Sequence, residues 1–156
     1  MLWVSIIQVI VSALTLRVAV VALSNWRRQL RNQNTDKCLS DAKLYEGAFN
    51  RYVDLRCNDA VPHEDKVKAY DEVWLSLRNL MASYEVVKRY DETLIDDIGA
   101  QCRESGIVKI PLLKEGQAPG AKDGADGQSA KTATEQIIAD LGIKLGEPKR
   151  FLGLGL

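Results

Sequence analysis

Residues 2–26 form a nearly unbroken run of apolar side chains, LWVSIIQVIVSALTLRVAVVALSNW. A helix rises about 1.5 Å per residue, so this run covers roughly 35 Å and exceeds the bilayer's hydrocarbon core of about 30 Å. Trp3 and Trp26 bracket it, as aromatic residues do at membrane interfaces. The pattern predicts a single transmembrane helix over residues 2–26.

Small and polar side chains form a stripe within this run. They follow alternating steps of three and four residues: Ser5, Gln8, Ser12, Thr15, Ala19 and Ala22. In lipid, small side chains let helices approach closely, and polar ones hydrogen-bond across the contact for about 0.6 to 2 kcal/mol. We interpret the stripe as an interface with another membrane protein or with a second copy of the chain. The alternative is that the hydroxyls bond to their own backbone.

Arg17 also lies in the run, nearly opposite the stripe. A charged residue near the centre of a membrane helix costs about 2.5 to 3.5 kcal/mol, and such residues usually face protein or water. Two explanations remain open. Its long side chain extends to the lipid headgroups, or a polar or acidic group of a second membrane protein binds it.

Basic residues follow the run, and none precedes it. The cluster consists of Arg27, Arg28, Arg31, Lys37 and Lys43. Because lysine and arginine close to a span favour the cytoplasmic side, we expect an inner-membrane protein with its N-terminus outside and its C-terminal part cytoplasmic. The alternatives are a signal peptide cleaved near Ser24 and an inverted anchor. The absence of a basic leader and the length of the run count against the signal peptide.

The remaining composition suggests one modest domain beside the anchor. The chain has 156 residues, with 21 basic and 21 acidic side chains, and this balance gives no indication of nucleic-acid binding. The three cysteines, Cys38, Cys57 and Cys102, are odd in number and lack the spacing of zinc or redox motifs. We expect them to be half-buried apolar side chains in a reducing compartment.

Residues 27–105 carry the helical period, so the fold class is predicted to be α. The apolar face of the first helix contains Cys38, Ala42, Tyr45, Phe49 and Tyr52. Pro62 ends this helix, and a second begins at about His63. Its stripe contains Val67, Tyr70, Trp74, Leu77, Met81 and Tyr84, widened by Val73, Leu80 and Val87.

Only a short loop ending at Pro62 separates the two helices. We therefore expect them to form an antiparallel, coiled-coil-like hairpin within residues 27–105. Two helices bury too little apolar surface to be stable alone. We therefore expect either a third helical segment around Ile98 or a second subunit to complete the core.

The C-terminal third is expected to be a tether and a docking segment. Residues 106–131 are rich in glycine and predict a flexible linker. Residues 132–156 open with a capping-box pattern at Thr132, which predicts a short helix followed by an apolar tail. We expect this tail to dock on a cytoplasmic protein through Ile137, Ile138, Leu141, Phe151, Leu152 and Leu154. A disordered tail, or one that folds back onto the hairpin, is the alternative.

No pattern of catalysis or cofactor binding is found in the sequence. His63 is the single histidine, the cysteines have no metal-ligand spacing, and no glycine-rich loop has the phosphate-binding form. We expect no catalytic, metal or cofactor site, and hence not an enzyme.

The sequence therefore predicts a single-pass membrane accessory or adaptor subunit that assembles with membrane or cytoplasmic proteins. A self-associating scaffold is the first alternative. The second is a membrane-disrupting lysis protein, because the layout of anchor, helical stalk and tail resembles that of phage inner-membrane spanins. That resemblance implies an external C-terminal part, opposite to the side that the basic cluster predicts.

Overall fold

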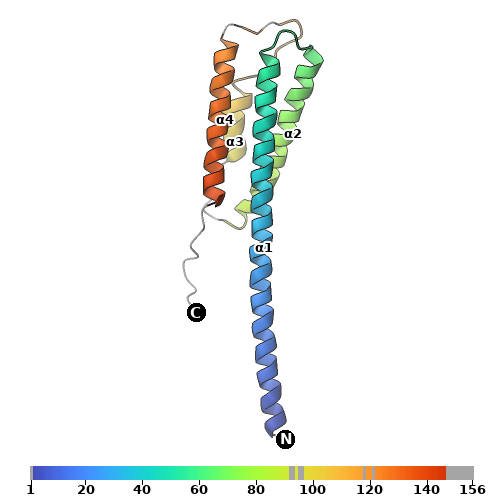
Figure 1. The fold of residues 1–156 in the computed structure, drawn as a ribbon, viewed down its shortest axis with the longest axis vertical. Helices are drawn as coiled ribbons and strands as arrows, with labels where there is room; N and C mark the ends of the chain where they lie inside the picture. Colours follow the sequence, from blue (N-terminus) through green and yellow to red (C-terminus); the bar gives the residue numbers. More distant parts are fainter. Residues whose placement is uncertain (1, 92–93, 95–96, 118, 121, 147–156) are drawn as a thin grey trace. The chain divides into compact units, whose positions relative to one another are not determined.

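The computed structural model describes residues 2–91, 94, 97–117, 119–120 and 122–146. Within these ranges the regular structure is entirely helical, in agreement with the predicted α class. The elements are α1 (Leu2–Arg56), α2 (His63–Lys88), α3 (Ile98–Cys102), a π-helical turn η1 (Arg103–Ile107) and α4 (Asp123–Gly146) (Figure 1).

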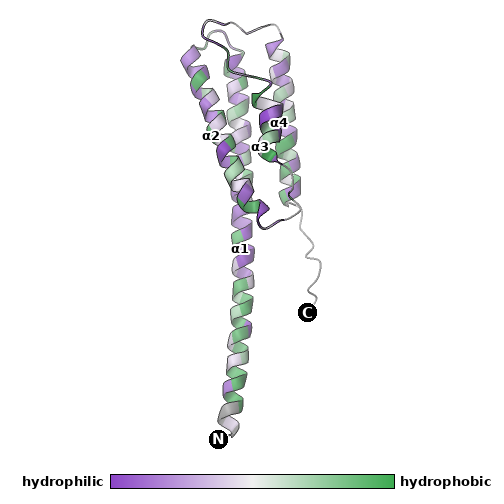
Figure 2. Ribbon diagram, turned by 180° about the vertical axis from the view of Figure 1, so that it is seen from behind, coloured by the Kyte–Doolittle hydropathy of each residue, from purple (hydrophilic) through white to green (hydrophobic). Residues whose placement is uncertain are grey.

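The chain forms two compact units, Met1–Asn34 and Thr35–Leu156. The first unit is the N-terminal part of α1, and its described side chains from Ile6 to Gln29 are all exposed. Figure 2 shows mostly hydrophobic colour over the N-terminal stretch of α1 and hydrophilic colour further along the helix. Neither glycine nor proline, the two residues least favourable in a helix, occurs before Gly47.

The second unit is built around the remainder of α1, and α2, α3 and α4 lie beside that part in both views (Figures 1 and 2). The predicted apolar face of α1 is confirmed, since all five of its members have no exposed surface: Cys38, Ala42, Tyr45, Phe49 and Tyr52. Tyr52 also contacts Tyr70 of α2, with ring centroids 5.2 Å apart.

The face of α2 that is buried is rotated by about one residue from the face that the sequence predicted. Leu77 and Tyr84 are buried as predicted, but Trp74 is 39% exposed and Met81 is 44% exposed. The face instead follows the positions expected only to widen it, Val73, Leu80 and Val87, together with Ala69. Large apolar side chains occur at neighbouring positions of α2. The spacing of apolar residues therefore predicts the direction of the buried face only to within about one residue.

Residues of α3 and η1 add to the core that α1 and α2 form. Asp97 caps α3 by accepting a hydrogen bond from the Ala100 amide at 3.0 Å. Gly106 in η1 lies against α1, where an added Cβ would be 3.1 Å from the Phe49 ring. The Tyr45 hydroxyl donates to the Cys102 carbonyl at 3.1 Å, so the π turn is held on α1 by packing and by hydrogen bonding.

The glycine-rich segment differs from the expected tether. Helix α4 begins at Asp123, so the last nine residues of the predicted linker are helical. Thr132 is not a helix cap, because it lies inside α4 and its hydroxyl donates to the Gln128 carbonyl at 3.1 Å. Gly127 is buried in the helix, where an added Cβ would lie 2.8 Å from Val53. Here glycine allows two helices to approach closely, rather than making the chain flexible.

Candidate functional site: the apolar helix and the Arg56 cluster

One helix in the described part of the chain is long and apolar enough to cross a membrane. The segment Ile6–Arg56 of α1 meets this criterion, and none of its most apolar window is buried within the protein. A core helix of a soluble domain would be covered by its own fold, whereas the side chains from Ile6 to Gln29 are exposed.

The hydroxyls of the small-residue stripe bond within their own helix. Ser12 Oγ donates to the Gln8 carbonyl and Thr15 Oγ1 to the Val11 carbonyl, each at 2.8 Å. These two groups are therefore satisfied without a second helix, as in the alternative considered from the sequence. Ala19 and Ala22 are exposed on α1. Ser5 belongs to α1, but its side chain lies outside the described part.

Two polar side chains of the first unit have no polar partner among the described residues. The Gln8 amide and the Arg17 guanidinium are exposed and make no hydrogen bond or ion pair there. The first acidic residue in the chain is Asp36. No carboxylate of residues 1–35 is therefore available to neutralise Arg17.

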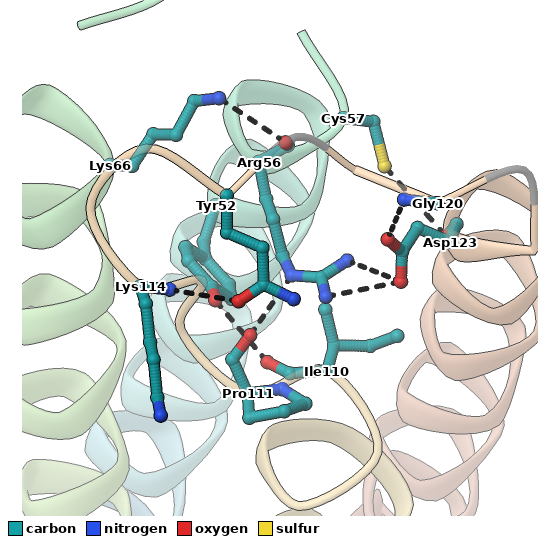
Figure 3. Close-up of polar contacts among 10 residues, drawn as sticks. Tyr52, Arg56, Cys57, Lys66, Ile110, Pro111, Lys114, Gly120 and Asp123 are labelled. Carbon is teal, nitrogen blue, oxygen red and sulfur yellow. Dashed lines mark hydrogen bonds and ion pairs between the residues drawn. The ribbon is translucent and has the colours of Figure 1, made fainter. Parts of the chain in front are cut away.

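A polar cluster centred on Arg56 lies at the carboxyl end of α1 (Figure 3). Only 4% of Arg56 is exposed. Its Nε donates to the Pro111 carbonyl at 2.9 Å, and Nη2 donates to Asp123 Oδ1 at 3.1 Å. The nearby Tyr52 hydroxyl donates to the Ile110 carbonyl at 3.3 Å. These contacts fasten the segment after η1, and the start of α4, to the end of α1.

Asp123 joins the cluster to the first turn of α4. One carboxylate oxygen accepts from the Gly120 amide and the other from Arg56. The Gly120 hydrogen bond, with the Arg56 bond and charge in support, holds the pKa of Asp123 below its ordinary value of 3.8. A carboxylate in the first turn also suits the positive end of the helix dipole. The cluster thus fixes where α4 begins.

A cavity of about 310 Å³ opens beside the cluster. Its lining contains Asp59, Val61, His63, Lys66, Leu113, Lys114, Gly116, Gln117 and Pro119. The two lysines do not converge on a ligand position. The Lys66 ammonium reaches the Arg56 carbonyl at 3.5 Å, and the Lys114 side chain points away from it in Figure 3. Lys66 therefore contacts the carboxyl end of α1, where a cation is favourable.

Burial raises the pKa values of the thiols and phenols of the core. Burial raises the pKa of Cys38 to about 11 and that of Cys102 to about 12. Burial likewise raises the pKa of Tyr45 and Tyr52. All three cysteines are free thiols, and Cys57 alone is exposed. Nucleophilic chemistry needs a thiolate, so the two buried thiols are structural.

Among the described residues, no group of three or more histidine, cysteine or acidic side chains is placed to hold a metal ion. His63 lies at the start of α2, half-buried, in the lining of the cavity.

The structure places part of the predicted docking segment in the core. Ile138 and Leu141 are each 3% exposed, and Ile137 packs against the same cluster. This matches the alternative in which the segment folds back onto the hairpin. The other three predicted docking residues, Phe151, Leu152 and Leu154, lie outside the described residues.

The Arg56 cluster is a feature that the sequence interpretation missed. A signal for it exists, because Arg56 continues the three-four spacing of Phe49 and Tyr52 on the buried face of α1. A basic residue in the last turn of a helix is ordinarily taken as a solvated cation near the negative end of the dipole. Its place on the apolar stripe was the indication of burial.

Comparison of the chain with protein families, curated proteins and solved structures gives no match.

Proposed function

We propose that this chain is a single-pass membrane-anchored accessory or adaptor subunit. In this proposal residues 2–26 cross the inner membrane with the N-terminus outside, and the helical second unit is cytoplasmic. The subunit acts by proximity, since an anchored unit meets its partner at a raised local concentration.

The exposure of the N-terminal part of α1 carries the proposal. Apolar side chains from Ile6 to Leu23 cover all sides of a helix that its own fold leaves uncovered. In water this surface would be very costly, at about 25 cal/mol for each Å² of apolar area. Lipid covers such a helix on all sides, and the basic cluster after Trp26 supports the cytoplasmic orientation.

Assembly with another membrane protein is supported by Gln8 and Arg17. Both are polar groups within the proposed span that lack a partner in the described part of this chain. Intramembrane arginines usually face protein or water, so Arg17 favours an acidic or polar contact in a second subunit. In the C-terminal region Ile138 and Leu141 are already occupied in the core. A docking role there would fall to Phe151, Leu152 and Leu154.

The test is gentle detergent extraction of the tagged chain from its native membrane, followed by identification of what co-purifies. We expect a larger membrane protein in fixed stoichiometry, lost in Gln8→Leu/Arg17→Leu and retained in the control Val9→Leu/Val18→Leu. A pure homo-oligomer would instead favour the self-associating scaffold, in which the stripe from Ser5 to Ala22 pairs with itself.

Orientation is tested separately with a topology reporter fused after Leu156. We expect cytoplasmic activity of the reporter. An external reporter, together with toxicity on expression, would favour the spanin-like lysis protein.

A further inference from the structure

Three neighbouring side chains follow the apolar part of α1, and all three are exposed. Trp26 is 59% exposed, and Arg27 and Arg28 are exposed beside it. They lie within an unbroken helix, so their directions differ by about 100° per residue and together they cover more than half of its circumference.

The positive charge of these arginines is not neutralised within their own unit. No acidic residue occurs in residues 1–35, and neither Arg27 nor Arg28 forms an ion pair among the described residues. The first unit therefore presents uncompensated cations directly beside an aromatic side chain at the end of the apolar run.

We propose that Trp26, Arg27 and Arg28 form a binding site for the headgroups of anionic phospholipids; this inference rests on the proposed membrane anchorage. The indole of Trp26 lies at the level of the glycerol and carbonyl groups, where amphipathic rings are favoured. The guanidinium groups bind headgroup phosphates, because their planar fork matches phosphate oxygens in a bidentate arrangement. The site selects lipids by net charge.

The size of the selectivity follows from the attraction of basic residues to an anionic surface. The attraction is worth about 1 kcal/mol for each arginine near such a surface, which corresponds to about a fivefold preference for an anionic over a neutral surface. We therefore expect anionic lipid to be enriched beside Trp26 by at least about fivefold over a neutral lipid at low salt. The enrichment falls at high salt, since the Debye length shortens from about 10 Å at 0.1 M to about 3 Å at 1 M.

The test uses Trp26 as its own reporter in the full-length chain. The chain has three tryptophans, so Trp3→Phe/Trp74→Phe leaves only Trp26. This background is reconstituted in phosphatidylcholine vesicles that contain a minor fraction of acyl-brominated phosphatidylglycerol or acyl-brominated phosphatidylcholine. The ratio of the two quenching efficiencies measures the preference for anionic lipid beside Trp26.

We expect a ratio well above one that approaches one in Arg27→Gln/Arg28→Gln and in 0.5 M salt. Arg27→Lys/Arg28→Lys keeps the charge and should retain most of the preference. The matched control, Lys109→Gln/Lys122→Gln, removes two exposed cations from the second unit and should leave the ratio unchanged. Should the glutamine variant fail to insert, the salt series on the parent chain still decides.

The outcomes separate this inference from the proposed function. Equal quenching by both lipids in the parent chain overturns the lipid site and leaves membrane anchorage standing. The same holds if the ratio is high but insensitive to the two arginines and to salt. Quenching by neither lipid shows that Trp26 does not reach the bilayer, and both proposals then fail.

Discussion

The two parts of α1 are both rich in apolar residues, yet they carry different patterns. From Ile6 to Leu23 the apolar side chains point in every direction and all are exposed. From Cys38 to Tyr52 they recur every three or four residues, and that face is fully buried. A protein core covers one side of a helix, whereas lipid surrounds all of it. The presence or absence of a period therefore indicates which solvent a helix is built for.

The largest effect should come from introducing charged residues into the exposed apolar segment of α1 from Ile6 to Leu23. In Ile10→Asp/Val18→Asp each aspartate costs about 2.5 to 3.5 kcal/mol near the centre of a span. We expect the chain to leave the membrane fraction in flotation after a carbonate wash. The control Val108→Asp/Ile143→Asp charges side chains that are 62% and 61% exposed in the second unit, and it should remain bound. Flotation of the first variant would contradict the anchor.

Substitutions in the buried face of α1 from Cys38 to Tyr52 should have a different effect. They should destabilise the second unit without releasing the chain from the membrane. Phe49 is fully buried against Gly106, so Phe49→Ala should lower the free energy of unfolding of the second unit by about 3 to 5 kcal/mol. Urea titration in mild detergent, followed by circular dichroism, measures this loss. Leu44 lies on the same helix but is 62% exposed. Leu44→Ala should change the free energy of unfolding by less than about 0.5 kcal/mol. A larger change would contradict the assignment of Leu44 to the exposed face of α1.

Removing Arg56 should loosen α4 from the end of α1. We expect Arg56→Met to cost about 2 kcal/mol, because it removes charge-assisted hydrogen bonds from a nearly buried site. Hydrogen exchange should increase in the first turns of α4. Arg51→Met is the control, since its ion pair with Glu72 is exposed on both sides and should contribute less than about 1 kcal/mol. Equal losses in both variants would argue against the cluster as the fastening point.

The same cluster predicts an acid sensitivity of α4. The pKa of Asp123 is depressed in the folded chain, so its stabilisation is present above the ordinary value of 3.8 and is lost as the pH falls through the folded value. We expect amide protection in α4 to decline below about pH 4. Asp123→Asn keeps an acceptor oxygen without the charge, and it should flatten this part of the pH profile. An unchanged profile would assign the sensitivity to other carboxylates.

The smallest effect should be a gain in stability. Thr134 is fully buried, and its hydroxyl has no hydrogen-bond partner among the described residues. Thr134→Val keeps the shape and removes the unpaired group, so we expect stabilisation by about 1 kcal/mol in the same urea titration. Thr132→Val, on the exposed side of α4, should change stability little. A loss of stability in Thr134→Val would mean that the hydroxyl is bonded in solution.

The sequence predicted the parts of the fold that depend on local periodicity. The buried face of α1 was predicted residue by residue, and α2 begins at His63 as expected. Proline and a regular three-four spacing act within a few residues, so neither needs knowledge of the rest of the chain.

What the sequence did not predict depends on distant contacts. Gly127 contributed to the expectation of a flexible linker, but its hydrogen atom faces Val53, which is far away in the chain. Composition alone cannot distinguish a glycine required by close packing from one that loosens the backbone. Arg56 was missed for the same reason, since its partners at Pro111 and Asp123 are 55 and 67 residues away.

The separation between Tyr52 and Leu141 in the chain also has a consequence during synthesis. At about 5 to 20 residues per second, the ribosome needs roughly 4 to 18 s after making the first residue to make the second. Throughout that interval the buried face of α1 lacks the residues of α4 that belong to the same core cluster in the finished unit. The nascent chain therefore passes through a stage with an uncovered apolar face, and chaperone demand should peak before α4 emerges.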